Sequence, residues 1–253
     1  MANVIEGFEE NVQTIQSYPI LTIAQSQTPE ISEGNIPNLK VGSLMNSISK
    51  QPLPERVELV AHKIWRSRVK LPARGEGSTI ECFSPDECQG MAYGKCAQCQ
   101  YADFNLKDAC KRQIVFMVTP KDEPTNLMRL IFWKSNYSTG NRLLKSLQNE
   151  CARRGAKSIF EVSFFVSTKR VKSEPAGSYY FVFQTEMGEK IEGEVLVQFK
   201  ETFDLVTSLR KENIESFYAS LVDHSSEETG IPPAPPADES GEIAEGTGDD
   251  VLM

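Results

Sequence analysis

The segment Cys82–Cys110, CFSPDECQGMAYGKCAQCQYADFNLKDAC, holds five of the six cysteines in this 253-residue chain. Strand-like runs lie on both sides of it, so the sequence predicts a small metal-bound insert within a larger β-rich core. Two residues separate Cys96 from Cys99, a spacing that lets both sulfurs of one turn reach the same tetrahedral ion at about 2.3 Å. The insert therefore predicts a zinc site.

Two more thiolates would close a structural zinc site, and Cys110 and Cys82 are the expected ligands, with Cys88 as a competitor for the fourth position. A site made only of sulfurs stabilises the fold and does not catalyse, since a catalytic zinc keeps a position for water and usually has a His ligand. His62 and His224 both lie outside the insert. A redox pair, disulfides and free thiols are the alternatives, although a redox pair usually begins a helix in a βαβ unit, which this segment lacks.

The length of the chain suffices for one sizeable core together with an insert and a tail. Its first residues lack the basic and then apolar pattern of a secretion signal, and no apolar run approaches the about 18 residues that span a bilayer. We therefore expect a protein of the reducing cytoplasm without membrane partners. Clustered cysteines in that compartment favour a metal over disulfides.

The net charge of -8 comes from the end of the chain. Residues 224–253 contain eight acids and no Lys or Arg, which leaves 35 minus 8, or 27, acids against 27 bases in residues 1–223. Residues 231–236 are proline-rich, and the residues after them have too little apolar content to fold. The sequence thus predicts a neutral folded part and a disordered acidic tail.

Three regions follow from these patterns. Residues 1–50 are expected to be poorly ordered or to pack at an edge, residues 51–223 to form the core with the zinc insert at 82–110, and residues 224–253 to form the tail. Expected strands cover 57–71, 114–118, 127–133, 159–170, 179–183 and 195–199, and expected helices cover 138–154 and 201–222. The fold class is β-rich α+β: an OB-like barrel or curved antiparallel sheet with a small zinc-binding insert, two helices and a disordered tail.

The strand at 57–71 has a basic face. Ala61 and Trp65 share one face by alternation, while Arg66 and Arg68 share the other, which we expect to face outward. In the strand at 159–170, Phe165 stands on a polar face between serines. We expect Phe165 and the bases around Arg66 to line one channel.

A neutral β-rich core with basic faces and interleaved aromatic residues favours binding of single-stranded nucleic acid. Basic side chains follow the phosphates, and each ring that stacks on a base contributes about 1 to 3 kcal/mol. The alternative is that large aromatic residues on strands belong to the core. The candidate stacking residues are Trp65, Trp133, Phe165 and Tyr180, and the candidate phosphate contacts are Lys63, Arg66, Arg68, Lys70, Lys169 and Arg170.

The tail ends in acids followed by an apolar tip: Asp249, Asp250, Val251, Leu252 and Met253. A tethered polyanion can occupy a basic groove until a nucleic acid displaces it, and the released tail can then recruit partners. Solubility is the alternative role for such a tail.

This layout resembles the single-stranded DNA-binding proteins of phages, which combine an OB-fold core with an acidic C-terminal tail. The cysteine cluster followed by β-runs is similar to that of the helix-destabilising proteins of T-even phages, which hold a structural zinc. The tail is similar in kind to those of bacterial single-strand-binding proteins, although it ends in Met253 and has few consecutive acids. The resemblance implies a protein that coats single-stranded DNA in replication, recombination or repair, in the host cytoplasm if phage-encoded, and recruits replication or recombination proteins through its tail.

Enzyme motifs are missing from the sequence. It has no phosphate-binding loop, no dinucleotide fingerprint and no paired-histidine zinc motif, so we expect no enzymatic activity. The alternative function is a zinc-containing structural or regulatory module that docks on replication or transcription machinery. DNA or RNA preference and assembly into a homo-oligomer are left open.

Overall fold

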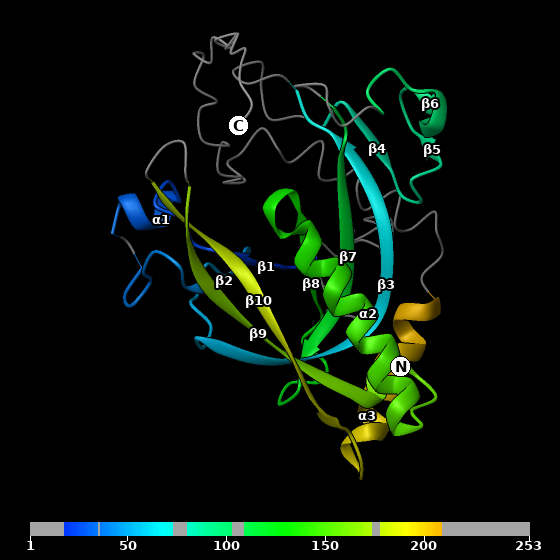
Figure 1. Cartoon of the computed structure of the whole chain (residues 1–253). Helices are drawn as coiled ribbons and strands as arrows, with labels where there is room; N and C mark the ends of the chain where they lie inside the picture. Colours follow the sequence, from blue (N-terminus) through cyan, green and yellow to red (C-terminus); the bar gives the residue numbers. More distant parts are fainter. Residues whose placement is uncertain (1–17, 35, 73–79, 103–108, 174–177, 209–253) are drawn as a thin grey trace, which may run out of the picture.

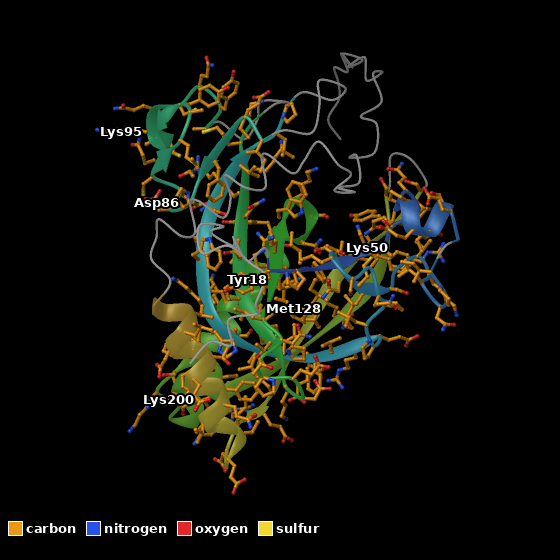
Figure 2. The ribbon with its side chains drawn as sticks, turned by 180° about the vertical axis from the view of Figure 1, so that it is seen from behind. Tyr18, Lys50, Asp86, Lys95, Met128 and Lys200 are labelled. Atoms are coloured by element: carbon orange, nitrogen blue, oxygen red, sulfur yellow. The ribbon has the colours of Figure 1, made fainter. Side chains whose placement is uncertain are left out.

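The computed structural model describes residues 18–34, 36–72, 80–102, 109–173 and 178–208. One sheet curls into a half-barrel, with helix α2 (Tyr137–Arg154) in front of it and helix α3 (Val195–Ser208) behind it (Figure 1). Seen from behind, α3 lies in front of the sheet, at the end of the molecule opposite Asp86 and Lys95 (Figure 2). The predicted β-rich fold with a curved sheet is confirmed.

The sheet has eight strands in the order β10-β9-β3-β7-β8-β1-β2, with β4 paired to β3 beside this path. All neighbours pair antiparallel except β1 and β8, which run parallel. The strand bounds are β1 (Ile20–Ile23), β2 (Leu44–Asn46), β3 (Arg56–Lys70), β4 (Cys82–Ser84), β7 (Lys111–Pro120), β8 (Met128–Trp133), β9 (Val162–Lys172) and β10 (Tyr179–Lys190).

Helix α2 covers the main core. Its Leu143 and Leu147 pack on the apolar face of the sheet, and the predicted helix over 138–154 is confirmed. Gly140 lets the helix lie close to β8, because a Cβ there would come within 2.5 Å of Phe132 Cβ. Gly155 ends the helix with φ 64°, a left-handed conformation that favours glycine. We call the sheet surface under this helix the α2 face.

Strand β3 carries one extra residue, His62. Ala61 pairs with Val118, while Lys63 pairs with Met117, so His62 has no partner of its own in the ladder and forms a β-bulge. Such a bulge exchanges the two faces of a strand. Ala61 and Ile64 therefore both lie on the α2 face, and the predicted sharing of one face by Ala61 and Trp65 is wrong.

Helix α3 packs on the opposite face, which we call the α3 face. Phe199 is fully buried there, against Val60, Phe160 and Ile191. The predicted strand over 195–199 is wrong, because these residues begin α3; a short apolar run reads equally well as a buried helix. The predicted helix over 201–222 is present to residue 208, and its remainder lies outside the described residues.

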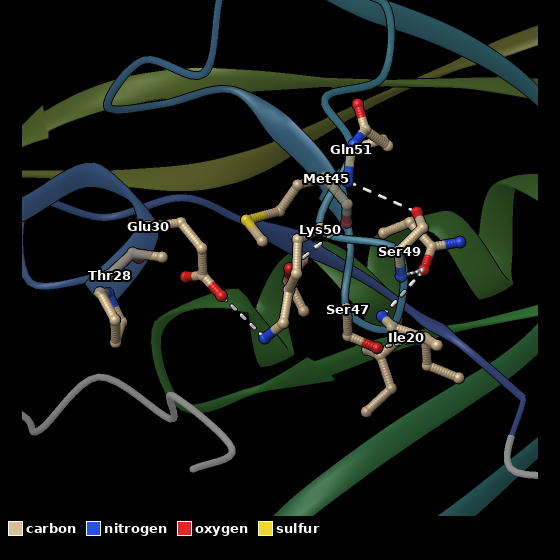
Figure 3. A network of polar contacts seen from close by, with 12 residues as sticks. Ile20, Thr28, Glu30, Met45, Ser47, Ser49, Lys50 and Gln51 are labelled. Carbon is tan, nitrogen blue, oxygen red and sulfur yellow. Dashed lines mark hydrogen bonds and ion pairs between the residues drawn. The ribbon is translucent and has the colours of Figure 1, made fainter. Parts of the chain in front are cut away.

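Residues 18–50 join the sheet at its β2 end. The one-turn helix α1 (Pro29–Ser32), which was not predicted, is held by an ion pair of 2.9 Å between Lys50 Nζ and Glu30 Oε1 (Figure 3). The Ile20 amide donates to Ser47 Oγ at 2.8 Å in the same network. Residues 1–17 and the predicted tail at 224–253 lie outside the described residues.

Side-chain amides cover part of the other end of the sheet, the outer edge of β10. Gln25 donates to the Phe181 carbonyl at 3.0 Å and accepts from its amide at 3.2 Å. Asn136, next to α2, accepts from the Phe183 amide at 2.8 Å. Within the described ranges, no helix has the length and apolar character needed to cross a membrane.

Candidate functional site

The cysteine module, residues 82–102 and 109–110, extends from β3. It contains β4, the two-stranded hairpin of β5 (Gln89–Gly90) and β6 (Gly94–Lys95), and the 3-10 helix η1 (Cys96–Gln98). One cavity of about 10 Å³, roughly the volume that a single water molecule needs, lies within it. The thiols that line this cavity are those of Cys82, Cys96, Cys99 and Cys110.

The structure thus brings the four expected ligands to one cavity, whereas Cys88 is exposed and does not line it. The cavity is tight, because a Cβ on Gly90 would lie 2.9 Å from the Cys82 sulfur. Burial, together with the nearby thiols of Cys99, Cys82 and Cys96, raises the pKa of Cys110 to about 11. The four thiols in this lining are donors that suit a soft cation.

In the described part of the chain, the four thiols are not positioned as metal ligands. Among the described residues, no group of three or more His, Cys, Asp or Glu side chains is arranged to hold an ion. The shared cavity and the mutual effect on the Cys110 pKa nevertheless place all four sulfurs around one space. The lining therefore supplies four thiol donors to one cavity.

A basic surface begins where α2 meets β3. Arg66 donates to Tyr137 Oη at 2.9 Å and to Asn141 Oδ1 at 2.8 Å, both on α2. Both acceptors are neutral, and no carboxylate within the described ranges forms an ion pair with Arg66. Two hydrogen bonds thus fix this guanidinium without neutralising its charge.

Arg112 on β7 extends this surface. Its register partner on β3 is Arg68, and its guanidinium carbon lies 5.3 Å from the centroid of the Tyr137 ring. Glu87 of the cysteine module accepts from Arg112 Nε and Nη2, each at 2.8 Å. Helix α2 has no acidic residue in its first turn, so its N-terminus adds positive potential. We call the group Arg66, Arg68, Arg112, Tyr137 and Asn141 the basic belt.

Two further cation–ring pairs lie on the α2 face. On the β9–β10 hairpin, the Arg170 guanidinium carbon is 3.8 Å from the centroid of Tyr179, which is 52% exposed. Beside the cysteine module, Lys70 Nζ is 4.7 Å from the centroid of Tyr101 and 3.2 Å from Glu81. Alternation of side chains along β3 and β9 puts both pairs on the side that α2 covers.

The ten predicted contacts are divided between the faces. Arg66, Arg68, Lys70 and Arg170 lie on the α2 face, and the alternation places Lys63, Trp65, Trp133, Phe165, Lys169 and Tyr180 on the α3 face. Phe165 and Arg66 thus lie on opposite faces of the sheet. The expected common channel for Phe165 and the bases around Arg66 is wrong.

Three of the predicted stacking residues of the α3 face, Trp65, Phe165 and Trp133, lie against neighbouring side chains. Trp65 is half-buried in apolar clusters with Phe83 and with Met117. Phe165 lies under Arg56, whose guanidinium carbon is 3.6 Å from the ring centroid and whose Nη2 contacts Glu186 at 2.7 Å.

Trp133 lies under Lys134, whose Nζ is 4.3 Å from the indole ring. Burial lowers the pKa of Lys134, and the nearby charge of Lys111 lowers it further.

The sequence reasoning missed Tyr137, Asn141, Arg112 and Glu87. One signal was available, because Tyr137 and Asn141 are four residues apart and therefore share one face of a helix. Comparison of the chain with protein-family models, curated proteins and solved structures finds no match.

Proposed function

We propose that this chain binds single-stranded nucleic acid, with the basic belt as its phosphate-binding centre. The observation that carries the proposal is the Arg66 guanidinium, which two neutral acceptors hold beside the N-terminus of α2. A phosphate there would meet this fixed cation, Arg112 and the backbone amides of the helix. The Tyr137 ring lies within reach of an adjoining base.

A single strand suits this surface better than a duplex. Tyr137, Tyr179 and Tyr101 each lie beside a cation on the α2 face, and rings of this kind stack on bases that are not already paired. The curved sheet with α2 at its face is compatible with an OB-type core. With the phage resemblance, we take single-stranded DNA, in replication, recombination or repair, as the ligand.

Two variants, each lacking one arginine from one face of the sheet, test the proposal. Arg66→Ala should weaken binding of oligo-dT at least tenfold, since a charge-assisted hydrogen bond contributes about 1.5 to 3 kcal/mol. The slope of log affinity against log salt should also fall by about one unit. Arg56→Ala, which removes an arginine from the α3 face, is the matched control. Equal affinities of the two variants, measured by fluorescence anisotropy, would contradict the proposal, and no binding by the unmutated chain would favour the partner-docking module.

We also propose that zinc stabilises the cysteine module, held by Cys82, Cys96, Cys99 and Cys110. Four thiolates would satisfy a tetrahedral ion and leave no position for chemistry. Metal analysis of the purified protein should give one zinc per chain, Cys99→Ser should lose it, and Cys88→Ser should keep it. Substoichiometric zinc in the unmutated protein would refute the site.

The acidic tail is proposed to compete with nucleic acid for the basic belt and, once displaced, to recruit replication or recombination proteins. The proposal rests on the eight acids without a base in residues 224–253. Removal of residues 231–253 should tighten oligo-dT binding at low salt, because a tethered competitor acts at high effective concentration. Unchanged affinity would leave solubility as the role of the tail.

A further inference from the structure

We infer that the cysteine module is itself part of the binding surface, and that Tyr93 together with Tyr101 forms a second base-stacking site. This inference rests on the proposed function of the basic belt. Tyr93 follows β5 at the hairpin tip and is 41% exposed, and Met91 beside it is 60% exposed. The rings of Tyr93 and Tyr101 are 5.1 Å apart between centroids, and Lys70 covers the Tyr101 ring.

A continuous row of cations joins this ring pair to the belt. Arg66, Arg68 and Lys70 follow one another on the α2 face of β3, at every second residue, which spaces them by about 6.6 Å. Arg68 lines the same cavity as Tyr93, so the middle of the row adjoins the module. Lys70, at the end of the row, is buried and ion-paired with Glu81 at 3.2 Å, so a strand that starts at Tyr137 can follow Arg66 and Arg68 and end at Tyr93.

The module is held rigidly enough to present a ring. Two hydrogen bonds from Arg112 to Glu87 join the module to β7, and β4 pairs with β3 from Cys82 to Ser84. Four cysteines line the cavity behind Tyr93. A ring that is fixed before binding loses little entropy when a base stacks on it. The positive charge of Arg68, which lines the same cavity as Tyr93, favours a ligand that brings phosphate with its bases over an apolar protein segment.

Oligonucleotide length separates this site from the belt. We compare dT oligomers of about 5 and about 16 nucleotides, which lie near the two ends of the usual range for one OB-type domain. Tyr93→Leu keeps apolar bulk at the cavity wall but removes the stacking face. It should weaken binding of the long oligomer about tenfold and leave the short one unchanged. Tyr93→Phe should restore the affinity, and Tyr180→Leu, a tyrosine change on the α3 face, should have no effect.

The outcomes of this comparison differ from those of the belt test. Equal affinity of Tyr93→Leu and the unmutated chain for the long oligomer would overturn the second site while leaving the belt in place, if Arg66→Ala still binds weakly. A loss for both oligomers would also overturn it, because Tyr93 would then act on the belt. The thiol reactivity of Tyr93→Leu under native conditions, compared with that of the unmutated protein, shows whether the cysteine cavity is intact.

Discussion

The two faces of strand β3 carry similar residue types but differ in how their arginines are held. On the α2 face, Arg66 is held by neutral groups, while Glu87 pairs with Arg112 and Glu81 pairs with Lys70. On the α3 face, Glu186 neutralises Arg56 and Glu58 neutralises Lys121 at 2.8 Å. A basic residue on a strand therefore indicates a binding surface only when its partners are known.

The rings of the two faces differ in the same way. Trp65 packs among apolar side chains below α3, so it contributes to the fold. Tyr137 and Tyr179 stand beside arginines at the rim of the α2 face. Tyr137 and Tyr179, beside arginines on the α2 face, are thus better binding candidates in this chain than the packed Trp65.

The largest expected effect comes from comparing Phe164 and Phe165, adjacent residues that lie on opposite faces of the sheet. Phe164 is fully buried in the α2-face core, 6.2 Å from Phe116 between ring centroids, and Phe164→Ala should cost about 3 to 5 kcal/mol of unfolding free energy. Phe165→Ala loses mainly its contact with Arg56 and should cost about 1 kcal/mol. Urea denaturation measures both. Similar losses would show that the α3 face is packed as tightly as the α2 face.

The next effect concerns acid sensitivity of the α3 face. His62 is 1% exposed, its Nε2 lies 2.9 Å from Thr119 Oγ1, and burial lowers its pKa from 6.5 to about 4. The folded state thus requires the neutral His62 ring. The contribution of this ring to the unfolding free energy is complete above pH 6.5 and is lost as the pH falls towards 4. The loss should reach about 3 kcal/mol across this window.

His62→Gln provides the comparison for this loss. The pH dependence of its unfolding free energy, measured by urea denaturation, should be flatter than that of the unmutated protein by the stated amount. If both proteins lose stability equally between pH 6.5 and pH 4, the carboxylates and not His62 control acid sensitivity.

The smallest effect compares two carboxylates. Glu87→Gln removes the negative charge that pairs with Arg112 of the belt and should tighten oligo-dT binding about two- to threefold, the size expected for one partly exposed charge. Glu186→Gln removes the corresponding charge beside Arg56 and should leave binding unchanged. Anisotropy titrations at low salt measure both. Tighter binding by Glu186→Gln alone would move the binding surface to the α3 face.

Local patterns predicted the elements whose signals lie within a few residues. The stripe of Leu143 and Leu147 with the stop at Gly155 located α2. The cysteine spacing paired Cys96 with Cys99 and left Cys82 and Cys88 as competitors, of which Cys82 lines the shared cavity. Alternation located β3, since side chains of a half-buried strand must alternate between core and surface.

The proposed binding surface depends on contacts that no local pattern contains. Alternation identified Arg66 as basic and outward-facing, but its partners Tyr137 and Asn141 lie 71 and 75 residues away. The run at 195–199 has the composition of a strand, and the burial of Phe199 against Val60 makes it a helix. Burial partners distant in sequence decided both cases.

The bulge at His62 also limits how this protein can change by mutation. Deleting that one residue would turn Trp65 towards α2 and Arg66 towards α3, exchanging the outward and inward halves of the strand together. Point substitutions cannot produce such an exchange. The face on which Arg66 and Arg68 lie therefore depends on the number of residues in β3. Insertions or deletions in this strand would alter that placement more than substitutions would.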